Sequence, residues 1–441
     1  MTSTTQTKGS PPSTPPSTPP TDLRELFPAL HLLRASGLAI DPRKMFLGGL
    51  ALVLLAFENW LFAFLPFAQS VGSIHVTIGS ETSVVTRLLG CAGFVTRPHL
   101  DVWLSWDAAA FALLTPIRTL IEPARVIFPA NQSWSNLAFA WTQLLWALIV
   151  WSFVGGALCR MNALQFATRK RLSVSAALKF SRRQLPGYLV APFLPLSAVL
   201  ILQGFNWLLG CVAGLAPSAG SIALGVGWFV VLFTGFLMAM LTVVIAIGWP
   251  LMIAAISTED SDGFDALSRA FGYLFDRPWH AGLFAVSSLP IFAVSRLLIA
   301  VLVGLAISLG AEAVDRGSES TMTTDRLNFS LEFERQGNVS PAGVVADRLD
   351  AALTRRRTFG WPGNFADNAL VAWTLIPALL YVGFGPSFFW SATTVSYFLL
   401  RRSDDGTPLD AVVDWPEKVE PETPVESEEK PSPVTSPDGE T

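Results

Sequence analysis

The chain has 441 residues, of which 51% are hydrophobic and only 15% charged, with a mean hydropathy of +0.46 and a formal net charge of −4. Soluble domains carry about 25% charged residues, so this composition argues against an ordinary soluble protein. The three cysteines, Cys91, Cys159 and Cys211, have no Cys-x-x-Cys spacing, which argues against a disulfide framework or a zinc site.

Both ends of the chain are predicted to be disordered tails. Residues 1–22 are dominated by Ser, Thr and Pro, and residues 403–441 by Asp, Glu and Pro. Neither composition offers enough apolar surface to offset the entropy lost on folding. Between the tails, residues 23–402 are predicted to form a transmembrane helical domain.

Several apolar runs in this domain exceed the roughly 18 residues that mark a membrane span. The sequence therefore predicts an all-α, polytopic transmembrane bundle with about six spans, at about 45–66, 137–158, 187–212, 221–257, 280–311 and 369–400. The last three are long enough to be either single tilted or kinked helices or pairs of short segments. Pro250 and Gly385-Pro386 are candidate kink points, because proline removes a backbone donor and clashes with the preceding turn.

Two segments between the spans are predicted to be small outer loops of mixed structure. In 68–136, alternating apolar residues at 74–78 indicate a strand, and 113–128 has the pattern of a helix lying on the membrane surface. In 312–367, the alternating "RLNFSLEF" at 326–333 indicates a second strand.

The distribution of Lys and Arg predicts the orientation. Segment 159–186 contains many basic residues and no acid, and it adjoins two spans, so we expect it in the cytoplasm. With six spans, both termini are then cytoplasmic as well. Segment 258–277 departs from this pattern because it holds five acids, but acids weigh little in the rule and we also place it inside.

An internal repeat supports that placement. "SAALKFSRRQLPGYLVAPFLPL" (175–196) resembles "FDALSRAFGYLFDRPWHAGLFAVSSLPI" (264–291): in each, Ala-Leu opens a short amphipathic helix, and a proline then precedes a new span. The repeat predicts that spans two–three and four–five are parallel hairpins related by an axis along the membrane normal. Chance similarity between two membrane-entry helices is the alternative.

One candidate site is an intramembrane polar cluster of Glu58, Asn59 and Arg296. An unpaired charge near the bilayer centre costs at least about 2.5–3.5 kcal/mol, and pairing of Glu58 with Arg296 would remove most of that cost. The alternative is that Arg296 reaches the outer headgroups and Glu58 is protonated.

A second candidate is a basic face suited to anionic lipid headgroups, although its charges alternatively only set the topology. It comprises Arg169, Lys170, Arg171, Lys179, Arg182 and Arg183. The sequence has no Gly-x-Ser-x-Gly elbow, HExxH motif or phosphate loop. We therefore expect no catalytic residue, no metal, no cofactor and no nucleic-acid partner; the expected partners are the lipid bilayer and another membrane protein.

Four stretches carry a resemblance to a known family: "LHLLRASGLAIDPRKMFLGGLALVLL", "WSFVGGALCRMNALQFATRKRLSVSAALKFSRR", "SDGFDALSRAFGYLFDRPWH" and "SYFLLRRSDDGTPLDAV". Over residues 28–412 the chain resembles a family of uncharacterised bacterial multi-pass inner-membrane proteins. It is also loosely similar to membrane domains found beside glycerophosphodiester phosphodiesterases. The resemblance implies a helical inner-membrane protein and supplies no catalytic residue.

Two functions are compatible with these features. The first is a non-catalytic membrane scaffold or accessory subunit, favoured by the missing catalytic motifs and the long tails. The second is a small-molecule or lipid transporter built on the hairpin repeat, favoured by the kinked spans and the buried charges. An intramembrane hydrolase would need a nucleophile and a base at one depth, and the sequence offers no such pair.

Overall fold

The computed structural model describes residues 28–62, 106–127, 133–215, 217–318, 373, 376–377 and 379–412. These ranges are helical with short connections and contain no β-strand, so the predicted all-α class is confirmed for them. The two predicted strands lie outside the described residues, as do the N-terminal tail and most of the C-terminal one.

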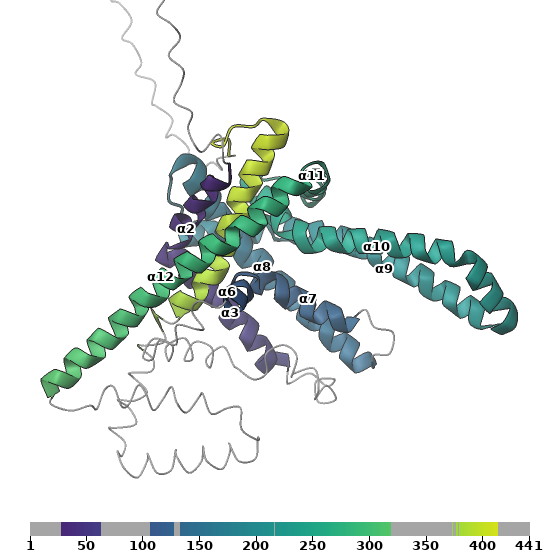
Figure 1. Cartoon of the computed structure of the whole chain (residues 1–441), viewed down its shortest axis with the longest axis horizontal. Helices are drawn as coiled ribbons and strands as arrows, with labels where there is room; N and C mark the ends of the chain where they lie inside the picture. The colour runs from purple at the N-terminus through teal and green to yellow at the C-terminus, as the bar shows by residue number, and fades with distance from the viewer. Residues whose placement is uncertain are drawn as a thin grey trace, which may run out of the picture.

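The helices follow one another along the chain as shown in Figure 1. They are the short 3₁₀ helix η1 (Pro28–Leu32), then α2 (Leu33–Ala39), α3 (Pro42–Phe62), α6 (Trp106–Leu113), α7 (Thr115–Ile127), α8 (Trp134–Thr168), α9 (Val174–Gly214), α10 (Pro217–Glu259), α11 (Gly263–Asp276), α12 (Pro278–Ser318) and a C-terminal helix at 379–405.

Polar caps fix where three of these helices begin. Ser133 accepts a hydrogen bond from Asn136 N at the start of α8, and Ser173 does the same for Ala176 N at the start of α9, both at 3.3 Å. Asp262 accepts from Asp265 N at 2.8 Å and opens α11. Each cap satisfies a backbone N–H that would otherwise lack an intrahelical partner.

Among the described residues, four helices are long and apolar enough to cross a membrane, which indicates a membrane protein. They are Trp134–Thr168, Val174–Gly214, Leu224–Glu259 and Pro278–Ala306, and they coincide with the second to fifth predicted spans. The first and sixth predicted spans fall on α3 and the C-terminal helix, which are not among the four. A total of six spans therefore stays a prediction.

The long apolar runs form single helices. Helices α10 and α12 are each continuous, with Pro250 inside the first and Pro290 inside the second. The described part of the last run, 379–405, is likewise one helix that continues through Gly385-Pro386. Of the two alternatives for these runs, single long helices are therefore what the described structure contains.

The helices converge on one densely packed region and diverge away from it. We call this region the base and define it as residues 150–164 of α8, 249–258 of α10 and 383–400 of the C-terminal helix, nearly all of them buried. In Figure 1 the antiparallel pair α9–α10 projects from the base in one direction, α12 in another, and α3 with α7 and α8 in a third.

Glycines bring the helices of the base into close contact. A methyl group added at Gly155 would lie 2.5 Å from the Trp390 indole, and one added at Gly156 would lie 2.5 Å from the Tyr188 ring. A methyl group at Gly48 of α3 would similarly meet the backbone of the C-terminal helix at Gly383. Small residues at such crossings are how helices associate tightly where water supplies no hydrophobic driving force.

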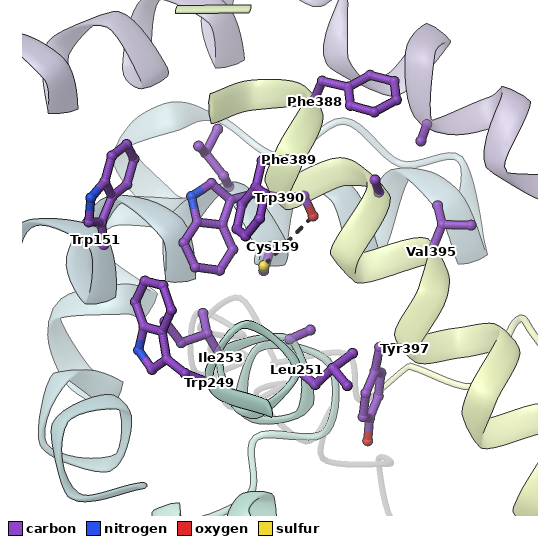
Figure 2. Close-up of a cluster of buried hydrophobic side chains, with 14 of the residues drawn as sticks. Trp151, Cys159, Trp249, Leu251, Ile253, Phe388, Phe389, Trp390, Val395 and Tyr397 are labelled. Carbon is purple, nitrogen blue, oxygen red and sulfur yellow. Dashed lines mark hydrogen bonds between the residues drawn. The ribbon is translucent and has the colours of Figure 1, made fainter. Parts of the chain in front are cut away.

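Tryptophan rings fill the centre of the base, as Figure 2 shows. The ring of Trp390 meets Trp249 edge-on at a centroid distance of 5.4 Å and lies 6.4 Å from Trp151. Edge-on pairs of this kind add to the stabilisation from burial. The thiol of Cys159 donates to the backbone oxygen of Trp390 at 4.0 Å, next to the same rings.

Two predicted helices have contacts that the sequence did not reveal. The predicted surface helix, α7, packs along α8, where Trp151 Nε1 donates to Thr119 Oγ1 at 2.8 Å, and its place on the membrane surface stays a prediction. In the repeat, the first amphipathic element is continuous with its span within α9, with Pro186 inside the helix. Only the second, α11, is separate, because Arg277 leaves the helical conformation before Pro278.

The glycine contacts give a direct test of the base. We expect Gly155→Ala to destabilise the protein by about 1–3 kcal/mol, because the added methyl group overpacks the Trp390 ring. The matched control is Gly282→Ala in α12, where a methyl group meets nothing within 4 Å. Thermal unfolding in detergent should show a lowered Tm for the first variant only; equal Tm values would contradict the packing described.

Candidate functional site

A buried arginine lies inside the base. Arg160 of α8 is 2% exposed, and its Nη1 donates to the backbone oxygen of Ser257 in α10 at 3.1 Å. Its guanidinium also stands over the ring of Phe180 in α9, 4.5 Å from the centroid. Arg160 therefore ties three helices together through charge-assisted and cation–π contacts.

The hydroxyl of Ser257 extends these contacts. Tyr188 OH and Ser257 Oγ lie 2.8 Å apart, and Ser257 Oγ donates to the backbone oxygen of Gly156 at 3.2 Å. A nucleophilic serine needs a base to accept its proton, and here the proton is directed at a carbonyl. This arrangement fastens α8, α9 and α10 and is not set up for nucleophilic attack.

Among the described residues, Glu259, at the end of α10, has the largest set of charged contacts. Its carboxylate accepts from Tyr397 OH at 2.6 Å and lies 3.2 Å from Arg401 Nε and 2.9 Å from Arg269 Nη1. The side chains of Glu259 and Arg401 are only 13% and 12% exposed. One carboxylate thus joins α10 to α11 and to the C-terminal helix.

The next residue, Asp260, joins α10 to α9. Its backbone is in the left-handed region, with φ of 57°, which aspartate tolerates better than most residues. In this turn its carboxylate accepts from Arg183 at 2.6 Å and from Gln184 at 2.5 Å. The acids of segment 258–277 are therefore direct partners of the basic residues of 159–186.

The C-terminal helix adds two acids from beyond the predicted domain boundary at 402. Asp405 accepts from Tyr273 OH at 2.9 Å, and Asp404 lies 3.9 Å from Arg277 Nε. Burial raises the pKa of the Tyr273 hydroxyl above its ordinary value, and the hydrogen bond to Asp405 adds to this shift. The described fold thus includes the first ten residues of the predicted tail, through residue 412.

Lys44, at the start of α3, is almost fully buried against α8. Its ammonium donates to Leu38 O at 3.0 Å, to Asn162 Oδ1 at 2.7 Å and to Gln165 Oε1 at 2.6 Å, which matches its three N–H bonds with three acceptors. Burial lowers the pKa of Lys44 to about 8 despite the nearby Asp41. Its contacts hold α2 and α3 against the end of α8.

The structure gives Glu58 and Arg296 different partners. Glu58 is buried and hydrogen-bonded to Gln143, whereas Arg296 Nε donates to Tyr381 OH at 3.1 Å. No ion pair joins the two within the described part of the chain, and the side chain of Asn59 lies outside it. Binding of a ligand by this cluster stays a prediction.

The predicted basic face is divided. Arg183 is committed to Asp260, while the other members lie exposed around the α8–α9 junction. These are Arg169, Lys170, Arg171, Lys179 and Arg182. Their exposure is compatible with binding of anionic headgroups, which also stays a prediction.

Sequence reasoning missed the residues that organise the base. Arg160 counted only as one of the basic residues of segment 159–186 that predict the orientation, yet it is buried, as is Lys44. Glu259 and Asp260 counted only as exceptions to the charge rule. The sequence did contain one signal. Both acids come directly after the charge-free run 187–258, so they are expected at the membrane face where the Lys and Arg residues of 159–186 lie.

Comparison with known proteins adds no relative. No protein-family model, curated protein or solved structure matches the chain. The functional argument therefore rests on the contacts above, which fasten helix ends together. Across the described ranges, moreover, no group of three or more His, Cys, Asp or Glu side chains is placed to hold a metal ion.

Loss of the Glu259 carboxylate should weaken the whole site. We expect Glu259→Gln to destabilise the protein by about 3 kcal/mol, because it leaves the guanidinium of Arg401, which is only 12% exposed, without its counter-charge. The matched control is Glu312→Gln, which removes the partner of Arg316 in an exposed pair and should cost at most about 0.5 kcal/mol. Thermal unfolding in detergent should show a much larger decrease in Tm for Glu259→Gln than for Glu312→Gln. A similar decrease for both variants would show that Glu259 has no special role.

Proposed function

We propose that the protein is a non-catalytic membrane scaffold or accessory subunit. The observation that supports this most directly is the packing of the base, where glycine contacts, three tryptophans and internally paired charges leave α8 residues 150–164 almost wholly buried. A scaffold needs such a fixed centre, from which other elements are presented to the membrane.

The projecting helices supply the surfaces that a scaffold would use. In the most apolar 18-residue window of α8, 50% of residues are buried, compared with 11% in α10 and 22% in α12. Both projecting helices thus expose large apolar side chains along most of their length. In a bilayer these side chains contact lipid or another membrane protein.

We further propose that the base faces the cytoplasm and that the chain lies in a bacterial inner membrane, as its family resemblance implies. The Arg183–Asp260 and Arg401–Glu259 pairs support a location on the same side of the membrane for three segments. These are 159–186, 258–277 and the end of the C-terminal helix. Because the most basic of these has no acid of its own, the positive-inside rule favours the cytoplasm.

Cysteine accessibility tests this orientation. In a variant lacking Cys91 and Cys211, single cysteines at Lys170, Ser268 and Asp410 should react with an impermeant maleimide only after the membrane is opened or inverted. A cysteine at Trp134, which is 86% exposed at the opposite end of α8, should react in intact cells. Reaction of the Ser268 position from outside would overturn both the shared side and the proposed orientation.

The transporter remains the second candidate because some polar side chains lie in the middle of apolar helices, outside the base. Glu58 is buried beside Gln143, and Arg296 Nη1 is buried without a hydrogen-bond partner in the described chain. Intramembrane ionisable groups often mark substrate paths. Alternating access, however, would require the helices of the base to separate.

Hydrogen exchange in lipid nanodiscs distinguishes the two functions. If the protein is a scaffold, amides of 150–164, 249–258 and 383–400 should exchange together and only by global opening, over hours to days. Residues 301–306 of α12 are apolar but mostly exposed, and they serve as the internal comparison. Exchange of the base within minutes, with the rest of the fold intact, would favour the transporter and contradict the scaffold.

A further inference from the structure

The far half of the α9–α10 hairpin is largely uncovered by the other described residues. Beyond residue 200, Trp207 of α9 is 69% exposed and Val226 of α10 is 83% exposed. Figure 1 shows the two helices extending side by side, away from every other described helix. Most exposed side chains here are apolar and suit lipid, so a polar one is informative.

Gln203 is that polar side chain. Its neighbour Asn206 faces the partner helix, where its Oδ1 accepts from Thr234 Oγ1 at 2.9 Å. Ser197 and Thr242 donate to backbone oxygens of their own helices. Among the amide and hydroxyl side chains described between residues 197 and 247, Gln203 stands out: it is exposed and forms no hydrogen bond with any other described residue.

The position of Gln203 makes this costly in a membrane. Residues 187–215 contain no charged side chain, and Gln203 is about 18 Å from Leu215 at the hairpin tip, at 1.5 Å per residue. With the hairpin tip at the membrane surface, that depth lies within the hydrocarbon layer, where neither water nor headgroups can bond the amide. An amide without a partner in hydrocarbon is unfavourable, so its exposure points to a partner outside this chain.

The surface around Gln203 permits close approach of a helix. At 100° per residue, Trp207, Gly210 and Gly214 lie within about 40° of Gln203 around the axis of α9. A methyl group added at either glycine would meet nothing within 4 Å, so both expose open backbone. We call residues 203, 207, 210 and 214 the Gln203 face.

We propose that the Gln203 face is the contact between two copies of this chain, with the two Gln203 amides hydrogen-bonded to each other across a two-fold axis. An amide both donates and accepts, so it is its own complement in a symmetric contact. Facing glycines let two α9 helices approach closely, as small residues do in membrane helix pairs. The inference needs the hairpin in a bilayer and does not depend on the scaffold function.

Cysteine cross-linking in native membranes tests the face. In a chain with Cys91→Ala and Cys211→Ala, and with the fully buried Cys159 retained, we introduce Trp207→Cys or Phe205→Cys. Both positions are exposed and close in depth, but they lie about 160° apart around α9. Mild oxidation should convert only the Trp207→Cys variant to a species of twice the 47.7 kDa monomer mass.

The role of the amide needs a second variant. Gln203→Leu should lower the association constant in detergent about fivefold, since an interhelical hydrogen bond in a membrane is worth about 1 kcal/mol. Phe205→Leu should leave association unchanged. Thermal unfolding of the monomer should match the wild type in both variants, because the exposed Gln203 side chain makes no hydrogen bond with the described residues that its loss would remove.

Four results would overturn the proposal. They are equal cross-linking at positions 205 and 207, no cross-linked dimer at either, a cross-linked species of another mass, and unchanged association of Gln203→Leu. The third would assign the face to a different membrane protein. Hydrogen exchange of the base bears on the scaffold function separately, so either proposal can fail without the other.

Discussion

The close contact of Trp390 and Tyr188 with the glycine pair of α8 is the constraint on which the base depends. Inside a bilayer, helices gain little from the hydrophobic effect and must associate through packing and polar contacts. Gly155 and Gly156 let two large rings lie directly against a helix backbone. That approach places Ser257 within reach of the Gly156 carbonyl and Arg160 within reach of α10. Side chains at the two glycines would separate the helices and leave these buried polar groups without partners.

The charged residues around the base then act mainly as fasteners between helix ends. Glu259 and Asp260 are consecutive but point to different helices, because the chain turns through a left-handed residue between α10 and α11. Their partners come from segments far apart in sequence, so the acids hold together the ends of α9, α10, α11 and the C-terminal helix. An acidic loop beside basic ones is consistent with the positive-inside rule once the acids are seen as counter-charges.

Hydropathy and helical periodicity predicted the helices that are determined by local sequence. The runs at 137–158 and 187–212 lie within α8 and α9, and the amphipathic pattern after Asp262 corresponds to α11. Contacts across long separations were not predictable, because no local pattern identifies the partner of Arg160 or of Glu259. The candidate pairing of Glu58 with Arg296 followed from depth along two separate helices, and depth does not determine which sides of those helices face each other. The separate helix expected before Pro186 also failed, since a proline in the sequence does not show whether packing will carry the helix through it.

The base has a consequence for biosynthesis. Ser387 of the C-terminal helix donates to the backbone oxygen of Ala39, so residues near opposite ends of the chain close the same structure. At about 5–20 residues per second, a ribosome needs tens of seconds to travel between them. During that interval the glycine surface of α8 and the carboxylate of Glu259, at the end of α10, lack their final partners. A newly inserted chain therefore has to be shielded, by the insertion machinery or by its own provisional contacts, until its last helix arrives.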